Sequence, residues 1–434
     1  MGSDISNLKP IEKSERIASL DIMRGVVLCG ILLMNINGMA LAEPSYSNPT
    51  IAGGSEGLDL YTWIMTNMFF EGTMRALFSL LFGVGMFVLL DRLEKSGAGI
   101  EAANIYFRRL MWLMLFGIIH AYLLLWVGEI LFTYSLMGFL VYSFRKLAPK
   151  TLIIIACVLF TLGTIWNVGS YLGEKELTGK AAEIATYKSE GKELTQELKE
   201  ANQELEKRAY EWSPEHVASV NEDMRKNYFH VVAFLAPINM HFHSYYTYRY
   251  DPWDVLSMML LGIALFKLDV LSATRSYRFY GLMALLGYLV GISVNYFETT
   301  TIMNGGFSAL SFAKSQITYD LGRVPTAIGH IGLIMLLSKA PILGFLKRAL
   351  SAVGKMALTN YLMHSIFAMF IFTGEGFGLF GTFMRHELIY IVLSIWLFQL
   401  IVSPIWLKYY HYGPAEWLWR YLSYLKKPSF KIRN

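Results

Sequence analysis

Asp21 and Arg24 lie at the edge of a long apolar run that also contains Asn35, and the three side chains fall on one face of a helix. Moving an unpaired charge toward hydrocarbon costs at least a few kcal/mol, so charges at the edge of a membrane span are usually paired or functional. An Asp–Arg pair can anchor the helix end. It can also bind an anionic group, with Asp21 orienting the Arg24 guanidinium. We predict that Asp21, Arg24 and Asn35 bind substrate.

His120 and Glu129 lie on either side of a short turn between two apolar runs. Antiparallel helices joined by a short turn can direct both side chains into one crevice. A carboxylate that orients a histidine gives a general base able to activate a hydroxyl or an amine. Glu129 fits the cap of a helix equally well, because the helix dipole stabilises a negative charge at the N-terminus. We predict catalytic roles for both residues.

Glu71 and Arg75 are four residues apart, which is the spacing of an ion pair across one helical turn. Such a pair closes the end of a helix, and a substrate contact is the alternative. We include both residues among the predicted substrate-binding residues. Gly83 and Gly85 follow in the same apolar run, where small residues allow helices to approach closely.

Asn360 and His364 share one face of a later apolar run. Hydrogen bonds between helices explain such residues well. Otherwise His364 is an alternative catalytic base and Asn360 binds substrate. His241 and His243 form an HxH pattern that lacks the further ligands of a zinc site, so we predict no metal.

The elements that position these residues are membrane helices. The chain has 434 residues, of which 54% are hydrophobic and 16% are charged, whereas soluble domains have about 25% charged residues. The mean hydropathy is +0.40, and several runs reach the roughly 20 residues that cross a bilayer. The basic residues are scattered among short loops, so we predict no nucleic-acid partner. The sequence predicts an all-α, polytopic transmembrane bundle.

We expect about ten spans. The loops rich in Lys and Arg alternate with loops poor in them, and the positive-inside rule then places both termini in the cytoplasm. This scheme requires residues 230–250 to lie along the outer interface instead of crossing the membrane. The expected spans cover residues 18–41, 75–91, 108–127, 129–145, 151–172, 253–270, 277–298, 323–339, 351–373 and 388–408.

A polar insertion interrupts the spans at residues 173–229. Apolar residues at heptad spacing amid Glu and Lys indicate an amphipathic helix there, and Ser213 followed by Pro214 marks the start of another helix. We predict an extracytoplasmic helical hairpin, acting as a spacer or lid rather than as a specific partner-binding element. The expected divisions are a five-span bundle (1–172), the hairpin (173–229), a second bundle with the interfacial segment (230–412) and a cytoplasmic tail (413–434).

The motifs along the chain resemble those of bacterial membrane proteins in the YeiB-like DUF418 family. In order they are SLDIMRG, FSLLFGVG, GIIHAYLLLWVGEILFTYSLMG, GKMALTNYLMHS and GPAEWLWRYLSYL. The resemblance covers nearly the whole chain except the insertion. That family in turn resembles heparan glucosaminide N-acetyltransferases and other integral-membrane acyltransferases, which share the Leu-Asp-x-x-Arg-Gly opening. The resemblance implies acyl transfer from a cytoplasmic acyl-CoA to an extracytoplasmic hydroxyl or amine, in the bacterial cytoplasmic membrane.

Two departures limit what the resemblance transfers. Where the DUF418 family usually has Gly-Asp-Ile-Leu, this chain has Glu129 in place of the aspartate, which is one methylene longer. The heparan acetyltransferases carry their key histidine soon after the first span, but the segment MALAEPSYSNPTIAGGSEG contains none. A catalytic histidine therefore cannot be assigned from that group by position.

Acyl transfer is the leading functional hypothesis. Acyl-CoA would bind near Asp21 and Arg24, and its pantetheine arm would extend along the roughly 21 Å of helix to Asn35. Asn35 or Asn360 would stabilise the oxyanion, with a histidine as base. The rival hypotheses are a transporter or channel for a small anion or metabolite, and a non-catalytic envelope scaffold. The expected partners are membrane lipids, the two small-molecule substrates and a second copy in a homodimer.

Overall fold

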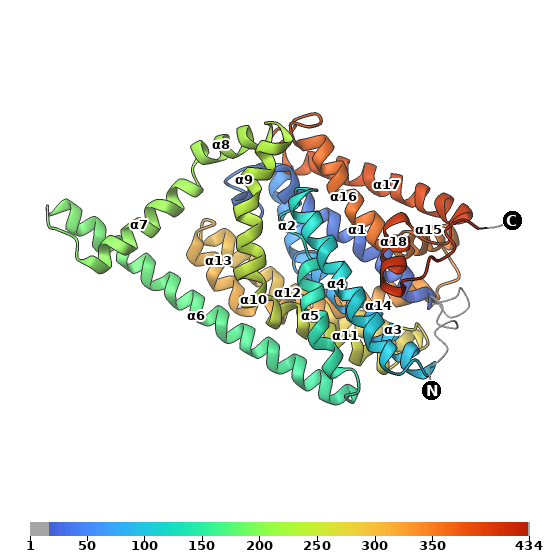
Figure 1. Cartoon of the computed structure of the whole chain (residues 1–434). Helices are drawn as coiled ribbons and strands as arrows, with labels where there is room; N and C mark the ends of the chain where they lie inside the picture. Colours follow the sequence, from blue (N-terminus) through green and yellow to red (C-terminus); the bar gives the residue numbers. More distant parts are fainter. Residues whose placement is uncertain (1–16, 433–434) are drawn as a thin grey trace.

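The structure is a computed structural model that describes residues 17–432, and these residues are helical apart from turns, loops and an isolated bridge between Tyr410 and Lys431 (Figure 1). The expected cytoplasmic N-terminus lies outside the described residues. The first helices are α1 (Ala18–Ala40), η3 (Glu43–Ser45), α2 (Gly57–Phe69), α3 (Thr73–Lys95), α4 (Ile100–Tyr122), α5 (Leu131–Phe144), α6 (Pro149–Ser189), α7 (Gln196–Glu211) and α8 (Pro214–Met224). The middle helices are α9 (Tyr228–His241), the π-helix η4 (Phe242–Tyr246), α10 (Thr247–Arg249), the π-helix η5 (Pro252–Leu256) and α11 (Ser257–Lys267). The last are α12 (Tyr277–Asn304), α13 (Ala309–Ser315), η6 (Gln316–Thr318), α14 (Tyr319–Lys339), α15 (Gly344–Lys355), α16 (Ala357–Phe372), α17 (Arg385–Tyr409) and α18 (Pro414–Tyr424).

Seven helical stretches among the described residues are long and apolar enough to cross a membrane, and each overlaps a span expected from the sequence. The other three expected spans correspond to α5, α11 and α16, which have 14, 11 and 16 residues. These helices are shorter than the roughly 20 residues of a full span. Local breaks explain the shortening of α16 and α11: the expected span at 351–373 is divided at Met356, and Pro252 with two π-helices interrupts the chain before α11. The total of ten membrane spans therefore remains a prediction.

The first helix, α1, forms the centre of the bundle, and 83% of its most apolar window is buried. It packs closely against α15 because both helices have a glycine at the contact. A Cβ atom at Gly25 would overlap the carbonyl oxygen of Leu350, and one at Gly354 would overlap the carbonyl oxygen of Asp21. Small residues of this kind allow the backbones of membrane helices to approach, as expected for the glycines of this chain.

Gly83 and Gly262 allow α3 and α11 to approach closely. A Cβ atom at Gly83 would lie 2.7 Å from the carbonyl oxygen of Met259, and one at Gly262 would lie 2.5 Å from that of Leu80. We expect Gly83→Leu to lower the free energy of unfolding by about 1–3 kcal/mol, because the added side chain must push two backbones apart. Thermal unfolding in detergent measures the change. The matched control is Gly281→Leu in α12, where nothing lies within 4 Å of the added Cβ; equal losses for the two variants would contradict the prediction.

The helix ends that the sequence assigns to the basic face lie together in space. An ion pair and hydrogen bonds join the ends of α3, α5, α11 and α14 and the loop after α11, and one hydrogen bond joins that loop to the start of α1. These contacts are Arg145 Nε to Glu94 Oε1 (2.9 Å), Lys267 Nζ to the Arg145 carbonyl (2.8 Å), Lys339 Nζ to the Ala273 carbonyl (3.0 Å) and Ser19 Oγ to the Leu271 carbonyl (2.8 Å). One end of the bundle therefore gathers the basic loops, as the alternation of charged loops predicts.

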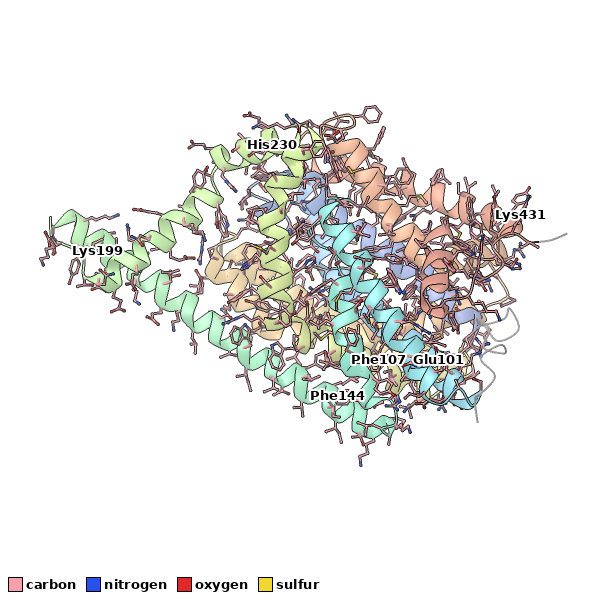
Figure 2. All side chains as sticks on the ribbon, viewed as in Figure 1. Glu101, Phe107, Phe144, Lys199, His230 and Lys431 are labelled. Carbon is pink, nitrogen blue, oxygen red and sulfur yellow. The ribbon has the colours of Figure 1, made fainter. Side chains whose placement is uncertain are left out.

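The insertion extends away from the bundle on the long helix α6, which continues without a break from the apolar residues into the polar ones (Figure 1). Helix α7 returns along it and packs Leu198 and Ala201 against Ile184. Ser213 caps α8 by accepting a hydrogen bond from the His216 backbone N–H, with a proline at the first helical turn, as predicted. Figure 2 places Lys199 of α7 at the opposite end of the molecule from Lys431.

Residues 230–250, expected to lie along the outer interface, are helical in the structure. They form most of α9, η4 and α10. The Tyr228 hydroxyl donates to the Leu123 carbonyl (2.8 Å), and the Asn239 side chain donates to the Ala121 carbonyl (2.9 Å), so α9 packs against the end of α4. The opposite side of this segment forms one wall of a large cavity.

Candidate functional site

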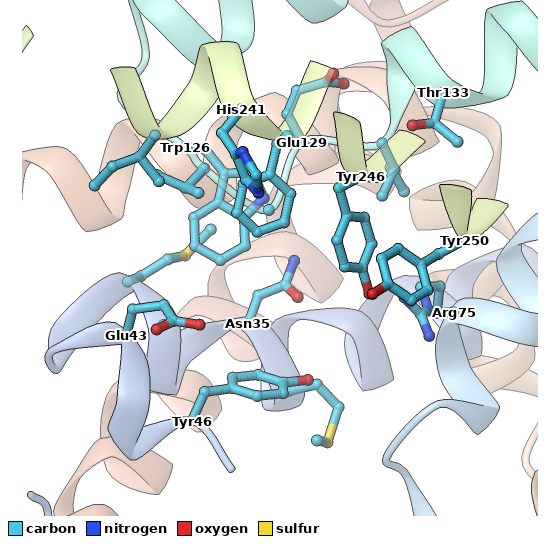
Figure 3. A pocket seen from close by; sticks show the side chains of 18 of the residues that line it. Asn35, Glu43, Tyr46, Arg75, Trp126, Glu129, Thr133, His241, Tyr246 and Tyr250 are labelled. Carbon is cyan, nitrogen blue, oxygen red and sulfur yellow. The ribbon is translucent and has the colours of Figure 1, made fainter. Parts of the chain in front are cut away.

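A cavity of about 1180 Å³ lies at the end of the bundle from which the insertion extends. It is larger than the roughly 300–1,000 Å³ of typical small-molecule sites. Its walls come from α1, α3, α6, α14 and α16, from the turn between α4 and α5, and from residues 234–255, while α7 and α8 contribute at its mouth. Figure 3 shows Asn35 near the middle, Arg75 with Tyr246 and Tyr250 on one side, and Glu129 with Trp126 and His241 on the other. The cavity therefore has two polar regions.

The first polar region is a charged network around Asp254. This carboxylate pairs with Arg75 (Nη2 to Oδ2, 2.7 Å) and with Arg323. Arg323, whose side chain is 2% exposed, also pairs with Asp320 (2.7 Å). Arg75 also donates a hydrogen bond to the Tyr319 hydroxyl (3.2 Å), which adds Tyr319 to the network. Arg323 thus joins α14 to η5, and Arg75 joins α3 to the same η5 carboxylate, so the network holds these three elements together.

Glu71 and Arg75 both line the cavity, but their predicted pairing across one helical turn is wrong in its geometry. Helix α3 begins at Thr73, after Gly72 with φ of 62°, so Glu71 precedes the helix. Glu71 instead accepts a hydrogen bond from the Tyr319 hydroxyl (3.0 Å). Arg75 forms its ion pair with Asp254.

The sequence reasoning missed the main partners in this network. Asp320 and Arg323 are three residues apart at the start of an apolar run, which is the spacing that drew attention to Asp21 and Arg24. That repeated pattern was the available signal. Asp254 gave no comparable signal, because its cations come from α3 and α14, far away in the sequence.

The second polar region joins His120 to Glu129, as the sequence predicts, and adds Ser365. His120 Nε2 lies 2.7 Å from Ser365 Oγ, and His120 Nδ1 lies 3.9 Å from Glu129 Oε1. On the other side of the carboxylate, His243 Nε2 lies 3.7 Å from Glu129 Oε2. Ser365, Glu129 and His243 are among the residues that line the cavity, whereas His120 is not; the side chains of His120 and Glu129 are both fully buried. This arrangement can move a proton between a hydroxyl and an imidazole beside a negative charge.

Glu129 also caps α5, which is the structural alternative that the sequence offers for this residue. Its carboxylate accepts the backbone N–H groups of Leu131 and, at 3.1 Å, of Phe132. These hydrogen bonds satisfy donors at the start of the helix. They also fix the carboxylate next to His120 and His243.

Two substitutions separate the two roles of Glu129. We expect Glu129→Ala to lower the free energy of unfolding by about 1 kcal/mol, because the N–H groups at the start of α5 lose their acceptor. Glu129→Gln keeps a side-chain oxygen as acceptor, so its loss should be smaller. Thermal unfolding in detergent and amide hydrogen exchange of residues 131–134 measure the difference. Equal destabilisation by the two variants would show that the charge, not the acceptor, stabilises the helix start.

Asp21 and Arg24 form their predicted ion pair (3.0 Å) but lie outside the cavity lining. The Arg24 side chain is 28% exposed, and its guanidinium lies next to Gly85 of α3. On α1 the cavity begins at Ile31, about two helical turns beyond Arg24. The pair thus belongs to the basic end of the bundle, and Asn35 belongs to the cavity.

Asn360 and His364 are buried between α16 and α17, also outside the lining. Asn360 donates to Ser403 Oγ (3.1 Å), and His364 Nε2 lies 3.2 Å from Gln399 Oε1. Gln399 in turn donates to the Asn360 carbonyl (3.1 Å). Hydrogen bonding between helices accounts for both residues.

Carboxylates outnumber cations in the cavity lining. The described lining contains seven Asp and Glu residues and three Arg and Lys residues. The first group is Glu43, Glu71, Glu129, Glu211, Asp251, Asp254 and Asp320, and the second is Arg75, Lys207 and Arg323. Like charges repel strongly where water is scarce. The cavity is therefore unsuited to a phosphate-rich group and better suited to a neutral or cationic molecule. No group of three or more His, Cys, Asp or Glu suited to a metal ion occurs within residues 17–432.

The chain matches one protein family and several bacterial proteins. A family model described as "Protein of unknown function (DUF418)" matches residues 242–426, which include the wall of the cavity from η4 onward. The chain is 30% identical to the protein YxaH of Bacillus subtilis (strain 168), with 97% of each chain covered. It is also 30% identical to YeiB of Escherichia coli (strain K12), with 94% of this chain and 96% of YeiB covered. No solved structure gives a significant match.

The alignments with the two bacterial relatives extend over nearly the full length of each chain, at an identity that indicates common descent. The helical architecture, with its seven membrane-length helices, agrees with the family resemblance of the sequence motifs. The chain is a helical membrane protein that belongs to the DUF418 family of YeiB-like proteins.

Proposed function

We propose that this protein is a membrane-embedded acyltransferase that moves an acyl group from a cytoplasmic acyl-CoA to a hydroxyl or amine acceptor bound in the cavity. The observation that carries the proposal is the contact of His120 Nε2 with Ser365 Oγ (2.7 Å) beside the Glu129 carboxylate, at the wall of that cavity. A base of this kind removes the proton of an attacking nucleophile. The proposed membrane is the bacterial cytoplasmic membrane, with the basic end of the bundle inside.

The cavity is the proposed acceptor site. Its excess of carboxylates disfavours the phosphates of coenzyme A and favours a neutral or cationic acceptor. Asn35 projects into the cavity, so its side-chain amide is the proposed donor to the oxyanion that forms during transfer (Figure 3). Arg75 and Tyr319 would then hold polar groups of the acceptor at the other side of the cavity.

The proposed donor site is the basic end of the bundle. Arg24 is partly exposed there and is held by Asp21, which suits it to a phosphate of acyl-CoA. In this scheme the phosphates stay at the basic end, and only the pantetheine arm with the acyl group enters the bundle. The proposal thus assigns donor and acceptor to opposite ends of α1.

Labelled acyl-CoA tests the function. Inside-out membrane vesicles from cells producing the full chain are incubated with radiolabelled acetyl-CoA, propionyl-CoA and succinyl-CoA, and label in lipid and glycan fractions is compared with vesicles lacking the protein. We expect protein-dependent transfer from at least one donor, and Arg24→Ala should raise the KM for the donor. Arg278→Ala, an exposed basic residue of α12, is the matched control. The absence of transfer from all three donors would overturn the proposal.

A further inference from the structure

Ser365 is the group through which His120 meets the cavity. His120 is fully buried and is not among the described residues that line the cavity, whereas Ser365 is. The distance of 2.7 Å from His120 Nε2 to Ser365 Oγ is that of a short hydrogen bond. A base in this position acts first on the Ser365 hydroxyl, and only through it on a molecule in the cavity.

The Glu129 carboxylate lies 3.9 Å from His120 Nδ1, beyond hydrogen-bond distance, and Nδ1 has no hydrogen-bond partner among the described residues. The nearby negative charge favours the imidazole proton on Nδ1, the nitrogen that faces it. Nε2 is then left as the acceptor for the Ser365 hydroxyl. The hydrogen bond from the Phe132 N–H (3.1 Å) holds the carboxylate in place. Three elements, α16, α4 and the start of α5, therefore bring a hydroxyl, an imidazole and a carboxylate into the order of an acyl-transfer triad.

We propose that Ser365 is a covalent nucleophile that carries the acyl group between donor and acceptor. Ser365 Oγ attacks the thioester carbonyl carbon of the donor while its proton passes to His120 Nε2; the new C–O ester bond forms, the C–S bond breaks, and the proton leaves with the thiolate. The acceptor hydroxyl or amine then attacks the ester carbonyl carbon: a new C–O or C–N bond forms, the C–O bond to Ser365 breaks, and the acceptor's proton passes through Nε2 to Ser365 Oγ, which regenerates the serine. This inference rests on the proposed function, because that function supplies the acyl donor.

A two-step reaction removes a geometric difficulty of direct transfer. In direct transfer, the donor thioester and the acceptor must occupy the cavity together, within reach of the base. With an acyl-serine intermediate the donor departs before the acceptor reacts. An acyl-serine intermediate also explains how His120 can act as a base although it does not line the cavity.

An alkyl fluorophosphonate tests the nucleophile directly. An activated serine attacks the phosphorus, the P–F bond breaks, and fluoride leaves, so the phosphonyl group stays on the protein. The full chain is treated in detergent, and the labelled peptide is identified by mass spectrometry. We expect label on Ser365 in the natural protein, no label in Ser365→Ala, and labelling at least about 100-fold slower in His120→Ala.

Ser79→Ala is the matched control, because Ser79 is also fully buried and bonds a side chain of another helix, the Tyr134 hydroxyl (2.8 Å). It should be labelled at Ser365 as fast as the natural protein. Two results would overturn the proposal: label that persists in Ser365→Ala, or a folded natural protein that takes no label. Ser365 would then serve only to form a hydrogen bond between α16 and α4.

The acyl-transfer assay separates this inference from the proposed function. Transfer by Ser365→Ala at more than a tenth of the natural rate would overturn the nucleophile and leave the acyltransferase intact. Conversely, label on Ser365 in a protein that transfers from none of the three acyl-CoAs would overturn the acyltransferase and retain an activated serine.

Discussion

Replacing Arg323 with methionine should lower the free energy of unfolding by about 3–5 kcal/mol, the largest effect that we expect from a single substitution outside the proposed catalytic residues. Arg323 is 2% exposed and pairs with both Asp254 and Asp320. Removing one partner of a buried ion pair leaves an uncompensated charge, which costs more than the pair contributes. Thermal and denaturant unfolding of the full chain in detergent measure the loss.

A second substitution shows whether the stranded charge is the cause. Asp254 keeps Arg75 as a partner (2.7 Å), so Asp320 is the carboxylate that Arg323→Met leaves without its cation. Adding Asp320→Asn should therefore recover a part of the lost stability. Arg278→Met is the control and should change the free energy by less than about 0.5 kcal/mol. A double variant as unstable as the single one would attribute the loss to packing instead.

His120→Ala should reduce acyl transfer by about 10² to 10⁴-fold, the range that a general base contributes. His364→Ala should reduce it by far less, because His364 bonds Gln399 (3.2 Å), which does not line the cavity, whereas His120 bonds Ser365, which does. The two histidines are equally buried, so the comparison controls for the loss of a buried imidazole. The measurement is the initial rate of transfer from labelled acyl-CoA, with thermal unfolding as the check on folding.

His243 provides the strictest comparison. It lines the cavity and lies 3.7 Å from the other oxygen of Glu129, so it competes with His120 for the role of base. We expect His243→Ala to retain more activity than His120→Ala, since the hydroxyl of Ser365 contacts His120. If His243→Ala loses more activity than His120→Ala, then His243 is the catalytic base and His120 is not.

Local properties of the sequence determined much of the architecture. Apolar runs of membrane length give α1, α3, α4, α6, α12, α14 and α17, because each such helix satisfies its own backbone groups. Ser213 caps α8 for an equally local reason, since a serine before a proline stabilises the first helical turn. The ion pair of Asp21 with Arg24 and the nearness of His120 to Glu129 follow from short separations along the chain.

Tertiary structure decided which of these residues share a cavity. Asn35, Glu71, Arg75 and Glu129 line it, whereas Asp21, Arg24, His120, Asn360 and His364 do not, and no periodicity in the sequence distinguishes the two groups. The partners of the lining residues come from distant segments: Asp254 is paired by α3 and α14, and Ser365 is 245 residues from His120. Side-chain contacts across such separations depend on how the helices pack, because spacing along one helix fixes only which face a residue occupies. Sequence alone placed the polar residues on membrane helices, and packing of those helices selected His120, Glu129 and Ser365 as neighbours.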